Sequence, residues 1–108
     1  MGEEYYRKAI KYIIEQVDDS VVCFFSDDVS WIKETFKDLP NAIIANEKRD
    51  LTDVQELQLM RLCRHQIISN SSYSWWGAWL NCSEDKIVIA PLNWKNKADM
   101  MPEQWKKM

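Results

Sequence analysis

Apolar positions along the chain alternate between a spacing typical of helices and one typical of buried strands. Residues 3–17 place apolar side chains three or four positions apart, which predicts an amphipathic helix. Short continuous apolar runs follow polar breaks and predict buried strands; they are residues 21–25, 42–45, 65–69 and 87–90. Helical spacing lies between these runs, in residues 30–38, 53–63 and 72–80, and Pro102 is expected to begin a short final helix.

Strands that alternate with helices predict βαβ units and a parallel sheet. Right-handed crossovers place helices on both faces of such a sheet. We therefore expect a Rossmann-like α/β fold, a three-layer α/β/α sandwich of about four parallel strands. A helix ahead of the first strand is unusual for a self-contained Rossmann domain, so residues 1–108 are expected to form a single domain cut from a longer chain.

Polar residues at the predicted helix starts indicate how each helix is capped. Ser30 is expected to cap the second helix, and Thr52 or Asp53 the third, with Glu56 completing a capping box. The third helix is expected to bury the face that carries Val54, Leu57, Met60 and Cys63.

Composition narrows the possible functions. The net charge of −3 gives no support to nucleic-acid binding. The sequence contains only 2 Gly, which is too few for a glycine-rich phosphate loop. The 3 Cys are widely spaced and fit a reduced intracellular setting, where they are expected to be small buried hydrophobes. The chain has neither a secretory signal core nor an apolar run long enough for a transmembrane segment, which predicts a cytoplasmic protein.

Ligands of open parallel sheets bind beyond the carboxyl ends of the strands, where residues 26–28, 46–47, 70–72 and 91–93 are placed. Asn70, Ser71 and Ser72 lie between a strand and a helix. Backbone N–H groups and hydroxyls there would form an anion cradle suited to a diphosphate. The alternative is that Ser71 or Ser72 simply caps the helix.

The adjacent carboxylates of Asp27 and Asp28 form the second candidate site. They could bind a metal, act as a base, or accept hydrogen bonds from the adjacent donors of guanine. The alternative is a pair of acids favoured by a helix dipole. Too few further ligands are present for a metal site, and His65, at the start of a strand, is expected to be structural.

Three tryptophans at helical spacing, Trp75, Trp76 and Trp79, are expected to build the core rather than to stack on a sugar or base. Residues 70–72 and 81–83 match the N-glycosylation sequon. Without a secretory signal, we interpret both matches as chance.

Several segments together resemble a known family. Residues 67–81 read IISNSSYSWWGAWLN and resemble the signature block I-I-S/A-N-S-S-F-S-W-W-G/A-A-W-L of the α-1,2-fucosyltransferases, glycosyltransferase family 11. Residues 24–31, FFSDDVSW, resemble the F-S-D-D-x-x-W block of that family, and residues 59–65, LMRLCRH, resemble its L-M-S-x-C-x-H stretch. The closing segments are matched by Ile89-Ala90-Pro91 with Trp94 and by Pro102 with Trp105. The departures are small: Tyr73 stands where Phe is usual, and Arg61 where Ser is usual.

The resemblance implies the C-terminal, donor-binding half of a GT-B-like glycosyltransferase. Such an enzyme moves L-fucose from GDP-β-L-fucose to the 2-hydroxyl of a terminal galactose, with inversion and without a required metal or other cofactor. By motif match, Asp27 or Asp28 would contact the guanine or its ribose, and Asn70, Ser71 and Ser72 would donate hydrogen bonds to the diphosphate.

The HxRRxD-type motif of the family is not in this sequence, and no catalytic base can be named. The expected partners are therefore GDP-fucose, a galactose-terminated glycan and a missing N-terminal lobe of the same enzyme, which could be peripheral to a membrane; nucleic acid is not expected. The isolated chain is expected to be inactive.

Two other functions remain open. A non-catalytic α/β interaction domain of the receiver type would use Asp27 and Asp28 as its acidic cluster, although no matching Thr and Lys follow on later strand ends. The other possible function is that of a degenerate sugar-nucleotide domain, which has lost its activity and serves only in protein assembly.

Overall fold

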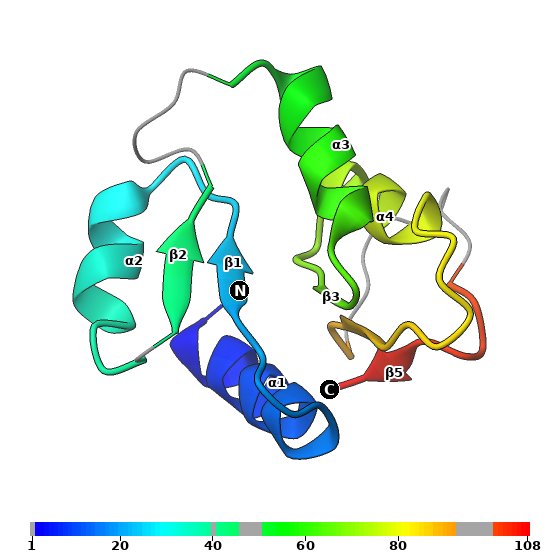
Figure 1. Cartoon of the computed structure of the whole chain (residues 1–108), viewed down its shortest axis with the longest axis horizontal. Coiled ribbons are helices and arrows are strands. Elements are labelled where there is room, and N and C mark those ends of the chain that lie inside the picture. Colours follow the sequence, from blue (N-terminus) through cyan, green and yellow to red (C-terminus); the bar gives the residue numbers. More distant parts are fainter. Residues whose placement is uncertain (1, 40, 46–50, 93–100) are drawn as a thin grey trace.

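The computed structural model describes residues 2–39, 41–45, 51–92 and 101–108, and shows helices alternating with short strands (Figure 1). In chain order the elements are α1 (Glu3–Gln16), β1 (Val22–Phe24), α2 (Val29–Thr35), β2 (Ala42–Ile44), α3 (Asp53–Leu62), β3 (Gln66–Ile67), α4 (Ser72–Trp79), β4 (Val88–Ala90) and β5 (Lys106–Lys107). The helices and strands predicted before residue 91 are all present. Residues 46–47 and 93–94, which the sequence analysis placed at the sheet edge or in a closing segment, lie outside the described residues.

The strands form two parallel sheets instead of the single sheet of about four strands that the sequence predicts. β1 pairs with β2, and β4 lies between β3 and β5. Among the described residues no hydrogen-bonded ladder joins β1 to β3; side chains connect the two sheets, because Ile67 of β3 packs in the same core cluster as Val22 and Phe24 of β1. Short parallel strands separated by helices remain compatible with a Rossmann-like fold.

The C-terminal segment forms strand β5 where the sequence predicted a helix from Pro102. The Trp105 amide donates to the Pro102 carbonyl at 3.1 Å, which makes a turn, and the Met108 amide then donates to the Ala90 carbonyl at 3.0 Å. Trp105 is buried in the core while the two strand residues after it are exposed. Burial of one large aromatic ring therefore fixes the segment as an edge strand.

Two apolar clusters form the core. One fills the space between α4 and the β3–β4–β5 sheet; its buried members are Ile68, Trp75, Ala78, Val88, Ala90 and Trp105. The other joins α1, α2 and the β1–β2 sheet, and its buried members are Ile10, Ile32 and Phe36. All three residues of β4 are buried, as expected for a strand that lies between two parallel neighbours.

Helix α1 contacts both sheets. The Tyr5 hydroxyl donates to the carbonyls of Ile68 and Ile89, at 2.6 and 3.2 Å, and so attaches the helix to the β3–β4–β5 sheet. One residue further on, Tyr6 packs against the cluster beside the β1–β2 sheet. Figure 1 shows α1 below β1 and β2, and the Tyr5 bonds extend its contacts to the other sheet.

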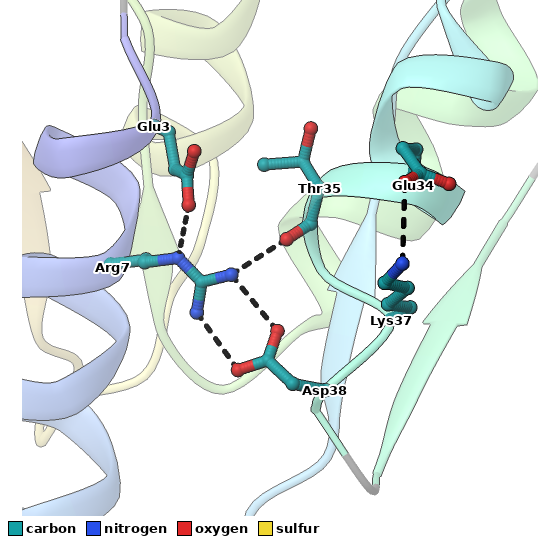
Figure 2. Close-up of polar contacts among 6 residues, drawn as sticks. All are labelled: Glu3, Arg7, Glu34, Thr35, Lys37 and Asp38. Carbon is teal, nitrogen blue, oxygen red and sulfur yellow. Dashed lines mark hydrogen bonds and ion pairs between the residues drawn. The ribbon is translucent and has the colours of Figure 1, made fainter.

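Arg7 fastens the first helix to the end of the second (Figure 2). Its guanidinium donates to both carboxylate oxygens of Asp38, at 2.9 and 3.0 Å, and to the Thr35 carbonyl at 2.6 Å. Glu3, one turn earlier, forms an ion pair with the same guanidinium. The hydrogen bonds from Arg7 lower the pKa of the Asp38 carboxyl, because they stabilise its charged form.

The capping of two helices differs in detail from the prediction. α2 begins at Val29, so Asp28 and not Ser30 is its cap, and the Asp28 carboxylate accepts from the Trp31 amide at 3.1 Å. α3 is capped by Thr52, as predicted, but Gln55 and not Glu56 completes its capping box. The capping box needs the third helical residue, and Glu56 is the fourth.

The predicted buried face of α3 is largely surface. Val54 is 67% exposed, Leu57, Met60 and Cys63 are partly buried, and no residue within α3 is fully buried. The helix packs on α4 instead, and Gly77 allows this close approach. A Cβ added at Gly77 would lie 2.9 Å from the Met60 sulfur and 3.1 Å from the Met60 Cβ, which is closer than side chains normally pack.

Two buried side-chain amides hold the end of α3. Gln66 donates to the carbonyls of Met60 and Cys63, at 3.0 and 2.9 Å. The Asn81 amide donates to the carbonyls of Cys63 and Arg64, at 3.0 and 3.2 Å, and to the side-chain oxygen of Gln66 at 2.9 Å. Carbonyls at a helix end lack partners within the helix, and these amides supply them.

Candidate functional site

The predicted diphosphate cradle is the turn at the start of α4. Ser71 is the N-cap, with an extended backbone, and its side-chain oxygen accepts from the Ser74 amide at 3.3 Å. The Ser71 amide donates to the Ser69 carbonyl at 2.8 Å. Asn70 and Ser71 are partly buried and Ser72 is exposed. The capping alternative is thus correct for Ser71, yet the hydroxyl that accepts the capping bond can still donate outward.

Three serines form a network around this turn. The Ser74 hydroxyl donates to the carbonyls of Ser69 and Ser71, at 3.2 and 3.0 Å, and lies 3.3 Å from the Ser69 hydroxyl. The Ser69 side chain also hydrogen-bonds with the Tyr6 hydroxyl, although burial is the larger effect and raises the Tyr6 pKa. The end of β3 is therefore fixed by bonds from both α4 and α1.

The end of β1 carries the second candidate pair, and its two carboxylates have different roles. Asp28 caps α2, and its amide donates to the Ser26 hydroxyl at 3.0 Å. Asp27 is exposed, and its negative charge helps to raise the pKa values of Glu56 and Tyr73. The charge of Asp27 therefore acts on residues at the starts of α3 and α4, whereas Asp28 is occupied in the structural role that the sequence analysis left open.

The ends of β1 and β3 open on the same cavity, which has a volume of about 540 Å³ and separates the two sheets. Ser26 from the end of β1 and Ser69 and Ser74 from the start of α4 all line it, together with Tyr6 from α1. The sequence analysis placed these two strand ends on one edge, and the structure brings them together. Asn70, Ser71, Ser72, Asp27 and Asp28 themselves do not line the cavity but border it through these serines.

Acidic groups dominate the electrostatics beside α4. Burial raises the pKa of Glu56, and the charges of Asp27 and Asp53 raise it further. Burial likewise raises the pKa of Tyr73, whose hydroxyl donates to the Asp53 carbonyl at 2.5 Å. An anionic ligand at the α4 start would meet helix N–H groups and, among the described residues, these nearby carboxylates, so additional cations would strengthen its binding.

The tryptophans of α4 divide into core and surface. Trp75 is buried, stacks on Trp79 with ring centroids 5.1 Å apart, and contacts Trp105 at 6.0 Å. Trp76 and Trp79 are 47% and 48% exposed, so the prediction that all three build the core is wrong for these two. Successive helix residues point about 100° apart, so Trp76 turns away from the face that buries Trp75. Trp79 lies on the same side as Trp75, one turn further on, and stacks on it as the last residue of the helix, where it keeps an exposed side.

The remaining chemistry-bearing residues act structurally or lie on the surface. The Nδ1 atom of His65 accepts from the Ile87 amide at 2.8 Å, which confirms the structural prediction. Cys82 is exposed, and Cys23 and Cys63 are only partly buried, so the cysteines are not fully buried hydrophobes. Among the described residues, no group of three or more His, Cys, Asp or Glu side chains is arranged to hold a metal ion.

The sequence analysis missed Tyr6, Ser69 and Ser74 as site residues. Tyr6 was assigned only to the apolar face of the first helix. The feature that could have identified Tyr6 is its hydroxyl, because a tyrosine on a buried face usually has a hydrogen-bond partner. Ser69 and Ser74 flank the predicted cradle within the same block of sequence, so an interpretation of the whole serine-rich segment would have included them.

In this chain, parallel strands end beside the capped start of a helix. α/β domains with this arrangement bind their ligands at the carboxyl ends of the strands. The chain belongs to glycosyl transferase family 11, because the profile of that family matches residues 2–108. This membership confirms the resemblance drawn from the signature block and favours a transferase over a receiver-like interaction domain.

Two curated relatives from Escherichia coli are similar to the chain. It is 43% identical over 105 residues to the O-antigen biosynthesis glycosyltransferase WbnK, a match that covers 94% of this chain and 35% of the relative. It is 35% identical over 113 residues to an alpha-1,2-colitosyltransferase, which covers 95% of this chain and 38% of that protein. The chain therefore spans little more than a third of the length of these relatives.

No solved structure matches the chain with statistical significance. Within the described part of the chain, none of the helices has the length and apolar character needed to cross a bilayer.

Proposed function

We propose that the chain is the donor-binding part of an inverting α-1,2-fucosyltransferase, which transfers L-fucose from GDP-fucose to the 2-hydroxyl of a galactoside. The observation that carries this proposal is the meeting of the β1 end with the capped start of α4 around one cavity. The name of the second relative, an alpha-1,2-colitosyltransferase, supports the linkage and leaves a colitosyl donor as the main alternative.

The α4 start supplies the groups for the diphosphate. Backbone N–H groups of its first turn, with the hydroxyls of Ser71 and Ser72 and the amide of Asn70, are hydrogen-bond donors of the kind that bind phosphate oxygens. Departure of the sugar leaves negative charge on GDP, and donors already aimed at that charge lower the barrier. The proposed mechanism uses these donors in place of a metal cofactor.

Asp27 is the better candidate for contact with the guanine. Its carboxylate is exposed and its charge acts on Glu56 of α3, whereas the Asp28 carboxylate accepts from the Trp31 amide as a helix cap. A carboxylate accepts from two adjacent donors, which guanine presents and adenine and uracil do not. The proposal thus assigns base selection to Asp27 and a supporting role to Asp28.

We assign further cations and the base to the rest of the enzyme. Among the described residues, Asp27, Asp53 and Glu56 make the surroundings of α4 acidic, so additional cations would strengthen the binding of a diphosphate. A full-length transferase has room for them, since the relatives are almost three times as long as the chain. We assign the general base and the acceptor-binding lobe to that remainder and expect no transfer activity from the chain alone.

The test is binding of nucleotides to the isotope-labelled chain, followed by the shifts of its backbone amides. GDP and GDP-fucose should shift amides of residues 26–28 and 69–74, and ADP or UDP should shift them much less. Asp27→Ala should weaken GDP binding by roughly 10-fold or more, since a hydrogen bond to a charged group contributes about 1.5–3 kcal/mol. Glu84→Ala, which removes an exposed carboxylate outside the cavity lining, is the matched control and should bind normally.

Two results would contradict the proposal. One is saturating GDP that leaves both segments unmoved. The other is equal binding of GDP and UDP with no effect of Asp27→Ala. Comparison of GDP-fucose with GDP-colitose then distinguishes the two donor sugars.

A further inference from the structure

Strands β2 and β5 each have an open edge that faces away from the cavity between the sheets, and the two edges differ in character. β5 consists of Lys106 and Lys107, both exposed, and lysines at a sheet edge oppose pairing with another chain. β2 carries no charged side chain, and its middle residue, Ile43, is 55% exposed. Apart from β1, no described strand lies beside β2. An uncharged open edge of this kind is a template for a further strand.

The backbone of β2 directs two of its residues toward this open edge. The Asn41 carbonyl accepts a hydrogen bond from β1, and the Ala45 amide donates one to β1, each at 2.9 Å. Alternate residues of a strand direct their backbone groups to the same side, so Ile43, which lies between them, also faces β1. The N–H and C=O groups of Ala42 and Ile44 therefore point outward and can bond to another strand.

We propose that two copies of the chain associate through β2, about a two-fold axis that passes beside Ile43. Antiparallel pairing about this axis sets Ala42 of each copy opposite Ile44 of the other, and the two residues exchange both of their N–H···O=C bonds. The outward groups of β2 are thus satisfied by the same surface on the second copy, as in the commonest symmetric dimers. Ile43 lies opposite Ile43 of the second copy, with Cα atoms about 4.5 Å apart.

Helix α2 covers only one face of this edge. Phe36, which follows α2, stacks on Phe24 of β1 with ring centroids 4.9 Å apart, and Ile44 packs against the same core cluster. Neighbouring residues of a strand point to opposite faces, so Ile43 lies on the other face, where its exposed side chain can pack against its copy. A groove of about 540 Å³ separates α2 from β2, and the second copy would cover it.

The charges around the end of α2 are complementary to themselves about the same axis. An axis perpendicular to the sheet keeps α2 of both copies on one face, where the two helices run in opposite directions. The exposed charges in chain order are Lys33, Glu34, Lys37 and Asp38, so each lysine lies opposite an acid of the second copy. Glu34 and Lys37 already form an ion pair within one copy (Figure 2), so the new pairs determine orientation more than affinity.

The proposed dimer leaves the donor site of each copy open. No residue of β2 lines the cavity between the sheets, and β1 lies between β2 and that cavity. Association is therefore independent of the proposed function, and it can be measured without a nucleotide.

The first experiment is sedimentation equilibrium of the unmodified chain over a range of concentrations. The average mass should rise toward twice the 12.9 kDa of one chain. Ile43→Lys should weaken association by about 10-fold or more, because two like charges replace an apolar pair. Leu62→Lys, at an exposed leucine of α3, is the matched control and should associate normally. An equal mixture of Ile43→Lys and Ile43→Glu should associate again, which separates a direct contact from misfolding.

The second experiment tests the register. Disulfides span Cα separations of about 4.4–6.8 Å, so Ile43→Cys should link to itself across the axis under mild oxidation. Trypsin then releases residues 38–48, which contain no other cysteine, as a peptide joined to a second copy of itself. Val54→Cys, at a similarly exposed position of α3, is the matched control and should not form such a link.

Three outcomes would overturn the proposal. The first is the mass of a single chain at the highest concentration reached, which would leave this edge to another part of the enzyme. The second is association that Ile43→Lys does not weaken or that the mixture of the two charged variants does not restore. The third is equal linking of Ile43→Cys and Val54→Cys.

Discussion

Replacement of Asn81 by Asp is the sharpest test of the packing behind the candidate site. The Asn81 amide is buried and donates to three oxygens, the carbonyls of Cys63 and Arg64 and the side-chain oxygen of Gln66. Asn81→Asp keeps the size of the side chain and removes its N–H donors. The three oxygens then face an acceptor, and an ionised carboxylate would be held close to all of them.

The expected loss of stability follows from two of these acceptors, the Arg64 carbonyl and the Gln66 side-chain oxygen, because the Cys63 carbonyl keeps its bond from the Gln66 amide. A buried acceptor left without a donor costs about 1–3 kcal/mol, so two of them cost at least about 2 kcal/mol. For a domain of about 100 residues, 1 kcal/mol lowers Tm by roughly 4–8 °C. The variant should therefore melt about 8 °C or more below the parent chain at pH 7. Protonation gives the carboxyl one donor, so part of the loss should return at pH 4.

Thermal unfolding followed by circular dichroism measures this change. The matched control is Asn41→Asp, because the Asn41 side chain is exposed and the same change of charge should cost little there. A decrease in Tm of less than about 4 °C for Asn81→Asp, or an equal decrease for both variants, would refute the view that this amide holds the end of α3.

Three further variants probe α4 and its surroundings. Ser71→Ala removes the cap and should cost about 1 kcal/mol in unfolding free energy, whereas Ser71→Gly should cost only a few tenths; equal losses would argue against a capping role. Glu56→Gln should raise Tm at pH 7 and raise it less at pH 4. Burial and nearby acids raise the Glu56 pKa above 4.5, so ionisation of this carboxyl destabilises the fold as pH rises. A gain in Tm that does not depend on pH would contradict this. Gly77→Leu should destabilise the chain by about 1–3 kcal/mol in chemical denaturation, because the new side chain would clash with Met60. The control Gly2→Leu places its side chain in open space and should not destabilise the chain. Similar denaturation midpoints for the two variants would refute the tight α3–α4 contact.

The local elements were predictable because they follow from local spacing. Continuous apolar runs located β1 to β4, and the serine-rich segment before the tryptophans located the start of α4. The family resemblance came from that same segment, and the family profile confirms it. These features depend on neighbours within a few positions, which a single sequence records directly.

The features that were missed depend on contacts between distant segments. Strand β5 consists of Lys106 and Lys107, which give no apolar signal; the buried ring of Trp105 and backbone bonds to the Ala90 region hold it in place. The division into two sheets, with α1 in contact with both, is a tertiary feature that no local pattern encodes. Within the candidate site, the position of Asp27 opposite Glu56 arises in the same way, from elements that meet only in the folded chain.

The two adjacent tyrosines of α1 give one helix control over the width of the cavity. Tyr5 bonds to the carbonyls of Ile68 and Ile89, and Tyr6 lines the cavity and bonds to Ser69. Successive side chains on a helix point about 100° apart, so a small roll of α1 moves both hydroxyls at once and in different directions. The helix is therefore a spacer between the two sheets: a substitution at Tyr6 alters the cavity lining while Tyr5 keeps the neighbouring sheet attached.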